Sequence, residues 1–394
     1  MKLKQVIPRR RTGTGSLKWD ALKKRFGSDD LLPLWVADMD FAAPACVEKA
    51  LAEMVEFGVY GYYTPEPSFW QAFIDWEQNR HGYRVQREWL RFSPGVVPAI
   101  YWLIGALTQP GDACAILSPC YYPFMNAVKD QGRKLICTDL IGQDGVYSID
   151  FAGFEQNIIR NGVKLFILCS PHNPVGRVWK KDELEKLLDI CRRHGVQVIS
   201  DEIHHDLIMP GFRHLPTATV AREEDKMITL TAPSKTFNLA GCQTAFAIIP
   251  DAELRARFDA YTRSICIPDA SAFGCTAAEA VYREGTPWLE EVLSIIHTNY
   301  LTIKERLAQK LPEAVVSPLE GTYLLWVDLG AYIPEDEMVQ VVQERCRLAV
   351  DFGNWFLEAG GDTHIRINLA TTEENIKEAL TRLLAGIQSY LSEK

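Results

Sequence analysis

Short apolar runs and amphipathic patterns alternate through the middle of the chain. Between two of the runs, residues 180–195 place Leu184, Leu187, Leu188 and Cys191 on one face of a helix, with Gly195 at its end. Strand and helix in this alternation predict an α/β fold whose mostly parallel sheet is covered on both faces. The runs that we interpret as buried strands are residues 112–121, 133–140, 163–170, 196–203, 226–233 and 243–250.

The last hundred residues follow a different pattern. A long helix is predicted over 288–311, then strands at 321–329 and 364–370 and a closing helix at 372–391. This order predicts a smaller α+β domain, which the N-terminal arm is expected to join. The predicted division is a large domain at 46–287 and a small domain formed by 1–45 and 288–394.

Length and composition narrow the possible functions. A chain of 394 residues is long enough for two domains. Its net charge of −9 disfavours nucleic acid as a partner. The ten cysteines include no C-x-x-C pair, and neither a secretory signal nor an apolar run of membrane-spanning length is found. We therefore expect a soluble cytoplasmic protein without membrane or nucleic-acid partners.

Four features with chemical potential follow one another along the predicted sheet. Gly95-Val96-Val97 is a glycine turn that runs into a helix, where backbone N–H groups attract a phosphate. Asn173 and Asp201 each follow a strand, at the sheet edge where α/β proteins bind ligands. Lys235 ends a further strand in Ala-Pro-Ser-Lys-Thr-Phe.

One cofactor, pyridoxal 5′-phosphate, accounts for all four features. It needs a lysine for an imine, an acid on its ring nitrogen, a donor at its phenolic oxygen and a phosphate cradle. Lys235, Asp201, Asn173 and the Gly95 turn supply these in order. Lys235 is also the natural base for the Cα proton of an amino-acid substrate, provided that burial lowers its pKa.

These motifs resemble those of the class I/II aminotransferase superfamily, the fold type I pyridoxal-phosphate enzymes. Within it the sequence is most similar to the cystathionine β-lyase (C–S lyase) branch of the MalY/PatB type. The resemblance covers nearly the whole chain. Its hallmark segments are Ser16-Leu17-Lys18-Trp19-Asp20, Pro33-Leu34-Trp35-Val36-Ala37-Asp38-Met39-Asp40-Phe41, Asp201-Glu202-Ile203-His204 and Ala232-Pro233-Ser234-Lys235-Thr236-Phe237-Asn238.

The resemblance implies further roles. Tyr121 matches the aromatic residue that stacks on the pyridine ring, and Tyr62 the tyrosine that reaches the phosphate of a neighbouring subunit, which implies a homodimer with shared sites. Arg366 matches the arginine that binds the substrate carboxylate, a task that suits its planar fork. Val36 and Ala37 match the backbone segment near that carboxylate. His204 and Ser234 complete the expected cofactor contacts.

One departure separates the sequence from most aminotransferases. They usually carry an arginine at the position of Gln243, and the lyase branch commonly shows the same replacement. The sequence therefore favours a β-lyase that cleaves cystathionine or related S-substituted cysteines into a thiol, pyruvate and ammonia. An aminotransferase that uses the same Lys235 and Asp201 is the alternative. A regulatory binding protein on the same fold is a third hypothesis, for which no residue identifies a surface.

Simpler interpretations exist for several of these residues. Lys235 could be a surface lysine at a strand end, and Arg366 an ordinary ion-pair partner. His204, His205 and Asp206 have the composition of a metal site. No second set of ligands at helix spacing is evident, so no metal is expected there.

Overall fold

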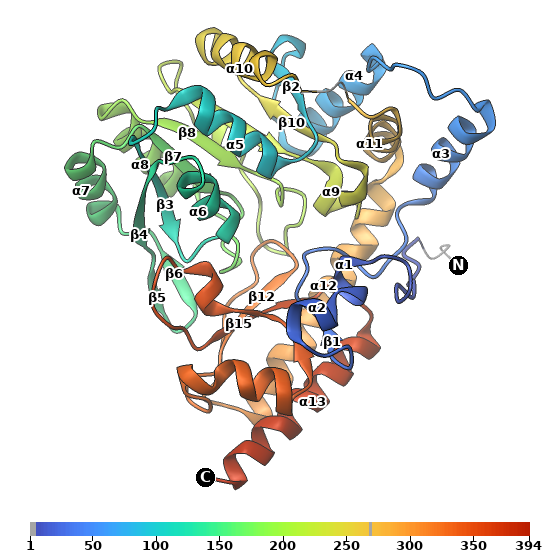
Figure 1. Ribbon diagram of the computed structural model, residues 1–394, viewed down its shortest axis with the longest axis vertical. Helices are drawn as coiled ribbons and strands as arrows, with labels where there is room; N and C mark the ends of the chain where they lie inside the picture. Colours follow the sequence, from blue (N-terminus) through green and yellow to red (C-terminus); the bar gives the residue numbers. More distant parts are fainter. Residues whose placement is uncertain (1–4, 268–269) are drawn as a thin grey trace.

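The larger sheet has the order β2-β10-β9-β8-β7-β3-β4 (Figure 1). The computed structural model describes residues 5–267 and 270–394, and within these ranges the sheet has seven strands. Neighbouring strands from β9 to β4 run parallel, whereas β10 is antiparallel to both β9 and β2. The strands are β2 (Leu90–Ser93), β3 (Ala113–Ser118), β4 (Lys134–Asp139), β7 (Leu165–Cys169), β8 (Gln197–Asp201), β9 (Met227–Thr231) and β10 (Ala245–Ile248). The predicted α/β fold with a mostly parallel sheet is confirmed, and β2 is a strand that the sequence did not indicate.

Alternation along the central strands buries both faces of this sheet. In β7, Leu165 and Ile167 pack into one hydrophobic cluster, while Phe166 and Leu168 pack into another. The first cluster includes side chains from α5 (Val96–Leu107), α6 (Tyr122–Lys129) and α10 (Ala252–Ser264). The second includes α7 (Phe151–Asn161) and α8 (Lys181–Arg193). Burial on both sides explains why the central strands are continuous apolar runs.

Helix α8 matches its predicted pattern closely. Leu184, Leu187, Leu188 and Cys191 are all buried, and Ile190 joins them. Gly195 has a φ of +66° just after the helix, as expected of a glycine that ends a helix. A polar outer face and a buried stripe together explain why this helix could be located from the sequence.

A second, smaller sheet has the order β11-β12-β15-β14 and is antiparallel in all its pairings. Its strands are β11 (Val315–Val316), β12 (Leu324–Asp328), β14 (Asp351–Phe352) and β15 (His364–Asn368). The long helix α12 (Thr286–Lys310) and the closing helix α13 (Glu373–Ser392) contribute to the same core. Ile296, Ile303 and Leu307 of α12 are buried as their spacing predicted.

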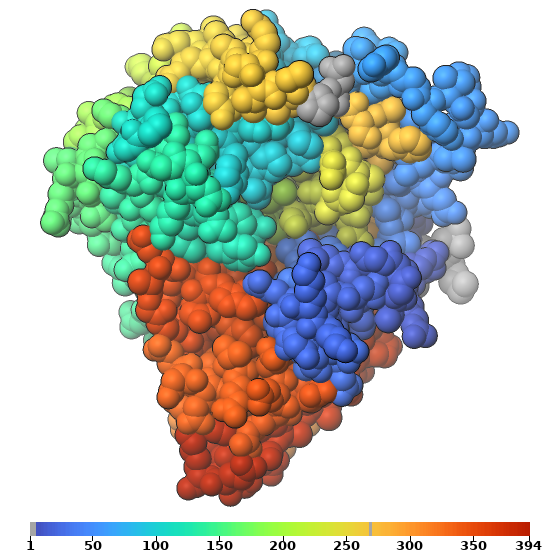
Figure 2. Space-filling model, viewed as in Figure 1, coloured from blue at the N-terminus to red at the C-terminus, as the bar shows by residue number. Residues whose placement is uncertain are grey.

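The N-terminal segment lies against this smaller sheet region, as Figure 2 shows where dark blue meets orange. Its strand β1 (Leu32–Pro33) pairs with β13 (Leu348–Ala349). Lys18 is fully buried and forms an ion pair of 2.7 Å with Asp40, which also accepts a hydrogen bond from Trp19 Nε1. Two of the hallmark segments are thus joined by a buried charge pair. The predicted domain boundaries at 45/46 and 287/288 stay a prediction.

The remaining elements connect these layers. No helix in residues 5–267 or 270–394 is long and apolar enough to cross a membrane. The remaining helices are α1 (Leu17–Asp20), α2 (Leu22–Phe26), α3 (Ala45–Phe57), α4 (Pro67–Trp76), α9 (Pro233–Thr236) and α11 (Ala272–Glu284). The short 3-10 and π-helices are η1 (Glu77–His81), η2 (Arg87–Trp89), η3 (Thr217–Thr219), η4 (Ala240–Cys242), η5 (Glu335–Glu337), η6 (Gln340–Arg345) and η7 (Gly353–Phe356). A two-stranded hairpin is formed by β5 (Ile141–Gln143) and β6 (Val146–Ser148).

Candidate active site

A cavity of about 200 Å³ opens where strands of the larger sheet end. Asp201 is the last residue of β8, Asn173 follows β7, and Lys235 lies in α9 just beyond β9. The sheet order places β7, β8 and β9 side by side, so the polar residues that follow them meet. Of the predicted site residues, ten line this cavity: Ala37, Gly95, Val96, Val97, Tyr121, Asn173, Asp201, His204, Ser234 and Lys235.

Lys235 is held by the N-terminal segment. Its Nζ donates a hydrogen bond of 2.7 Å to the carbonyl oxygen of Ala37, and the hydroxyl of Tyr323 donates one of 2.8 Å to the same oxygen. Burial lowers the pKa of Lys235 to about 8, although the Asp38 and Asp201 carboxylates oppose the shift. An amine with such a pKa is unprotonated in a sizeable fraction near neutral pH, which suits a nucleophile and a base.

Asp201 is a buried carboxyl next to that amine. Burial raises its pKa to about 7, while a hydrogen bond of 3.0 Å from the backbone N–H of Ile203 lowers it. The neighbouring Glu202 points elsewhere, since its carboxylate bonds Ser200, His214 and the Thr217 backbone. A cationic ring nitrogen in the cavity would return Asp201 to its ionised form.

His204 also lines the cavity and is buried as a neutral imidazole. Burial, with the nearby cations Lys235 and Arg366, holds its pKa well below the usual range. Its Nδ1 has no hydrogen-bond partner among the described residues. A buried polar atom without a partner indicates that the cavity accommodates a polar group.

Arg366 lies behind Asn173, which lines the cavity, and the two side chains are hydrogen-bonded. Arg366 Nη1 donates to Asn173 Oδ1 at 2.9 Å, and Nη2 contacts the Trp35 carbonyl and Asp351. Because the amide oxygen of Asn173 is occupied, its nitrogen is the group left to donate. Arg366 Nε is buried without a partner in the described part of the chain, so the guanidinium keeps one donor for a ligand.

The phosphate cradle predicted at Gly95 is the start of α5. The first N–H groups of a helix have no intrahelical acceptor, and those of Val96 and Val97 belong to this set. Gly95 itself is extended, with φ at 179°, a conformation open to any residue. A side chain there would come within 3.3 Å of the Pro98 ring, so glycine serves packing and close approach.

Three predicted site residues do not line the cavity in the described structure. Arg366 lies directly behind Asn173, as its hydrogen bond shows. Val36 offers its carbonyl oxygen to Asn368 at 2.6 Å, one residue from Ala37. Tyr62 is fully exposed and is not among the residues that line the cavity of its own chain. Its predicted role in a neighbouring subunit stays a prediction.

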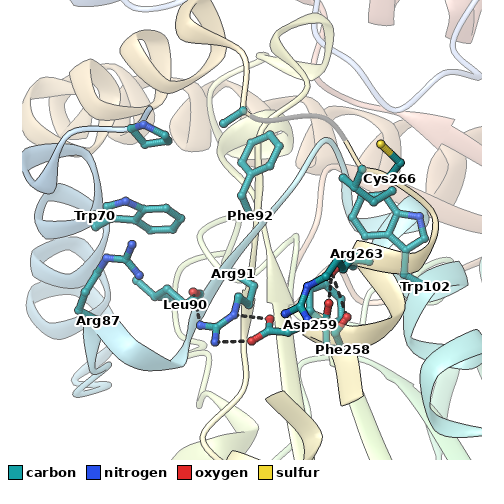
Figure 3. A pocket seen from close by; sticks show the side chains of 14 residues that line it. Trp70, Arg87, Leu90, Arg91, Phe92, Trp102, Phe258, Asp259, Arg263 and Cys266 are labelled. Carbon is teal, nitrogen blue, oxygen red and sulfur yellow. Dashed lines mark hydrogen bonds and ion pairs between the residues drawn. The ribbon is translucent and has the colours of Figure 1, made fainter. Parts of the chain in front are cut away.

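A larger cleft of about 660 Å³ lies elsewhere, between α4, α10 and the start of β2 (Figure 3). Three of its charged residues already have partners. Arg91 forms two hydrogen bonds with Asp259, at 2.6 and 2.8 Å, and the Arg87 guanidinium stacks 4.0 Å from the Trp70 ring. The smaller cavity is therefore the better candidate, because it gathers buried titratable groups with shifted pKa values.

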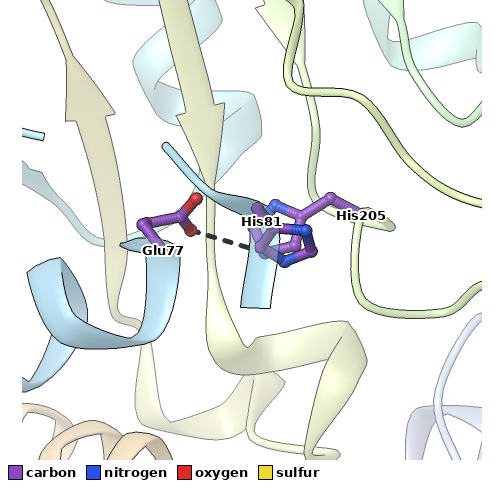
Figure 4. Close-up of side chains that lie close together, drawn as sticks. All are labelled: Glu77, His81 and His205. Atoms are coloured by element: carbon purple, nitrogen blue, oxygen red, sulfur yellow. Dashed lines mark ion pairs between the residues drawn. The ribbon is translucent and has the colours of Figure 1, made fainter. Parts of the chain in front are cut away.

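Another buried cluster joins Glu77, His81 and His205 (Figure 4). Glu77 and His81 are four residues apart in η1. This helix-spaced pair was not evident from the sequence, which predicted no metal at residues 204–206. However, both rings turn a nitrogen toward Asp206, His81 Nε2 at 2.8 Å and His205 Nε2 at 3.2 Å. Burial opposes a charged His205, but the Asp206 and Glu77 carboxylates outweigh it and raise the pKa of His205 to about 9. The Glu77 and Asp206 carboxylates therefore stabilise a protonated His205 within this cluster.

Two residues near the cavity were missed from the sequence. Tyr323 anchors the Ala37 carbonyl across 286 positions of sequence, and Asp351 pairs with Arg366 inside the smaller sheet. Tyr323 directly precedes strand β12, Asp351 begins strand β14, and neither residue belongs to a recognisable motif. They become neighbours of the site only through the packing of the two sheets, which no local pattern reports.

The residues present fit pyridoxal phosphate. The cavity supplies an amine, a buried carboxyl, an amide donor and a helix start, which are the partners that the imine, ring nitrogen, phenolic oxygen and phosphate require. Tyr121 is half-buried and offers a flat ring at the cavity wall, and burial of its hydroxyl raises the pKa of that group, so it stays neutral. Nothing in this lining demands another class of ligand.

Comparisons with known proteins agree with the geometry. The family model for aminotransferase class I and II matches residues 29–383. The cystathionine β-lyase PatB of Bacillus subtilis is 40% identical over 379 residues, 96% of this chain and 98% of that protein. Among solved structures, cystalysin from Treponema denticola, which contains pyridoxal 5′-phosphate, is similar with a TM-score of 0.94 and 36% identity, covering 99% and 100% of the two chains. A PLP-bound putative aminotransferase from Clostridium difficile gives 0.93 and 41%, covering 96% and 98%.

Proposed function

Because the chain belongs to the aminotransferase class I and II family, we propose that it is a pyridoxal-phosphate-dependent C–S β-lyase of fold type I. Its substrates are cystathionine or related S-substituted cysteines, and its products are a thiol, pyruvate and ammonia. The observation that carries the proposal is the meeting of Lys235 and the buried Asp201 in one cavity beside Arg366 and Asn173. The lyase assignment draws on the similarity to PatB and on Gln243, which lines the cavity where most aminotransferases have arginine.

The residues divide the work of the reaction. Bound in the cavity, pyridoxal phosphate would supply an electron-accepting ring next to the Cα of the substrate. Asp201 would pair with the ring nitrogen, Asn173 would donate to the phenolic oxygen, and the start of α5 with Ser234 would hold the phosphate. Tyr121 would stack on the ring, and His204 would pack beside it.

Arg366 orients the substrate by its α-carboxylate, with the backbone of Val36 and Ala37 close by. Lys235 would hold the cofactor through its amine, and the same amine, once free, is the base that removes the Cα proton. The electron pair of that C–H bond becomes the second bond between Cα and Cβ. The C–S bond breaks at the same time, and a thiolate leaves Cβ. Water then converts the unsaturated amino-acid fragment into pyruvate and ammonia, so atoms and charge balance without an external oxidant.

The test is an assay with cystathionine for pyruvate and free thiol in equal amounts. A small panel of cysteine thioethers then defines the thiol side of the substrate. If the purified protein instead needs a keto acid and transfers only the amino group, the lyase proposal is wrong and the aminotransferase alternative holds. An amino acid without a leaving group makes the same distinction, because stable conversion to the pyridoxamine form marks a transaminase.

We further propose that the enzyme is a homodimer in which Tyr62 of one subunit reaches the phosphate site of the other. Exposed apolar side chains around Tyr62 support this arrangement, namely Phe57, Val59 and Tyr60. Light scattering on the purified protein tests it, and a monomer that is fully active would contradict it. The ten unpaired cysteines, most of them buried, suit the reducing cytoplasm in which we propose that the enzyme works.

A further inference from the structure

Residues 35–41, which we name the strap, cross between the two sheets next to Lys235. On one side, Asn238 accepts from the Met39 N–H at 3.0 Å and donates to the Met39 and Phe41 carbonyls. On the other side, Asn368 Nδ2 donates to the Val36 and Asp38 carbonyls, each at 2.6 Å. The strap is thus fixed by the loop that carries Lys235 and by the strand that carries Arg366.

Asp38 lies in the strap directly after Ala37, whose carbonyl oxygen accepts the Lys235 amine. Its Oδ2 accepts a hydrogen bond of 2.7 Å from Arg11 Nη2. Its Oδ1 is buried and has no hydrogen-bond partner among the residues that the structure describes. A carboxylate with one unused buried oxygen favours a nearby cation, because little water screens it.

We propose that Asp38, with Arg11 as its counter-ion, is a positioning residue that controls the protonation and the resting place of the Lys235 amine. The inference rests on the proposed function in one respect, that Lys235 is the working amine. Asp38 attracts the ammonium form toward the strap, and Arg11 limits that attraction. Together they decide how readily the amine gives up its proton.

The other charged groups around Lys235 do not by themselves account for the pKa of its amine. After burial, which disfavours the ammonium, the strongest electrostatic influence on Lys235 is Asp38, ahead of the cation Arg366 and the carboxylate of Asp201. His204 contributes no charge, since its pKa is far below the usual range. Tyr323 stays neutral for the opposite reason, because burial and Asp38 raise the pKa of its hydroxyl.

A purely structural role for the pair makes a different prediction. Arg11 also contacts the Met39 carbonyl at 3.2 Å and Asp40 at 3.7 Å, so it helps to attach the N-terminal arm. If attachment were its whole purpose, Asp38→Asn and Arg11→Gln would lower stability alike and would leave the titration of Lys235 unmoved. The electrostatic role instead predicts opposite shifts, because one change removes an anion and the other removes its counter-cation.

The experiment measures the pH midpoint at which Lys235 becomes reactive. Full-length protein freed of cofactor is treated with trace acetic anhydride across a pH series, and acetylation of Lys235 is quantified by peptide mass spectrometry. We expect a midpoint near 8 in the unsubstituted protein. Asp38→Asn should lower it by about one unit, and Arg11→Gln should raise it. Asp259→Asn, which removes an Arg–Asp pair at Arg91, is the matched control and should leave it unchanged.

In the cofactor-loaded enzyme, the pH midpoint of the visible spectrum should move in the same two directions. An unmoved midpoint, or two shifts of the same sign, overturns the proposal. If Asp38→Asn fails to fold, as circular dichroism would show, the direction in which Arg11→Gln shifts the midpoint tests the proposal alone. Absence of pyruvate formation with both midpoints shifted as expected would instead count against the β-lyase function and leave this inference standing.

Discussion

Arg366 Nη1 and Asn173 Oδ1 are joined by a hydrogen bond of 2.9 Å, which links the smaller sheet to a loop of the larger one. The bond orients both residues: it turns the amide nitrogen of Asn173 toward the cofactor side and fixes the plane of the guanidinium. In the proposed function, this single contact would couple recognition of the substrate carboxylate to recognition of the ring oxygen.

Arg366→Lys should raise the KM for cystathionine by about tenfold to a hundredfold, because an ammonium cannot present the planar fork that bonds a carboxylate. The preference for the amino acid over its decarboxylated analogue should fall with it. Steady-state kinetics with both substrates measure the effect. Arg193→Lys, which changes an exposed arginine on α8, serves as the control. An unchanged KM would show that another group binds the carboxylate.

Lys235→Ala should lower kcat by at least about a hundredfold, since the change removes both the nucleophile and the base. The protein should also lose the yellow colour of a covalently held cofactor. Absorbance spectra and pyruvate release provide the two readouts. Lys181→Ala, at an exposed position of α8, should change neither. Unchanged turnover in the Lys235 variant would contradict the assignment of this residue.

Asp201→Asn should alter how the stability of the cofactor-free protein depends on pH. The pKa of Asp201 is about 7 in the folded state, above the usual 3.8, so the folded state binds the proton more tightly than the unfolded state. The carboxyl therefore makes stability fall as pH rises from about 4 to 7, and the variant lacks this loss. Above pH 7 the variant should be more stable by up to about 4 kcal/mol, a difference that disappears below pH 4.

Urea unfolding of both proteins across that range measures the difference. Asp139→Asn, at an exposed position of β4, should behave as the unsubstituted protein does. A stability difference that is the same at every pH would show that the pKa of Asp201 does not differ between the folded and unfolded states, and would contradict the raised value.

Lys18→Met should destabilise the protein by about 3 kcal/mol or more, because it leaves the buried Asp40 carboxylate without its ion-pair partner. Equilibrium unfolding in urea gives the value. Lys377→Met breaks an exposed pair with Glu373 and should have an effect below about 0.5 kcal/mol. Equal effects would mean that the Lys18–Asp40 pair contributes no more than a surface pair.

The local pattern of apolar and polar residues was enough to locate part of the fold and of the candidate site. The central strands and α8 could be located because burial on both sheet faces, or on one helical stripe, leaves a periodic trace in the sequence. Lys235, Asn173 and Asp201 could be brought together because each follows a strand of one parallel sheet, where carboxyl ends share an edge. The position of Tyr121 and Arg366 came from family resemblance alone.

The rest depends on contacts between distant segments. The hydrogen bond from Lys235 to Ala37 spans 198 positions, and that from Tyr323 spans 286. The helix-spaced pair Glu77 and His81 lies far from His205 in the sequence, so no local spacing connects it to that residue. Such meetings depend on how the two sheets pack, and neither spacing nor composition encodes that arrangement locally.

The strap brings a segment near the amino end of the chain into contact with the Lys235 amine. Trimming the first forty residues would remove the carbonyl that accepts the hydrogen bond of the Lys235 amine, 198 positions further along the chain. If Asp38 and Arg11 act as proposed, a protein shortened in this way reacts over a different pH range even where both sheets are kept. The beginning of this polypeptide would then set the reactivity of its middle.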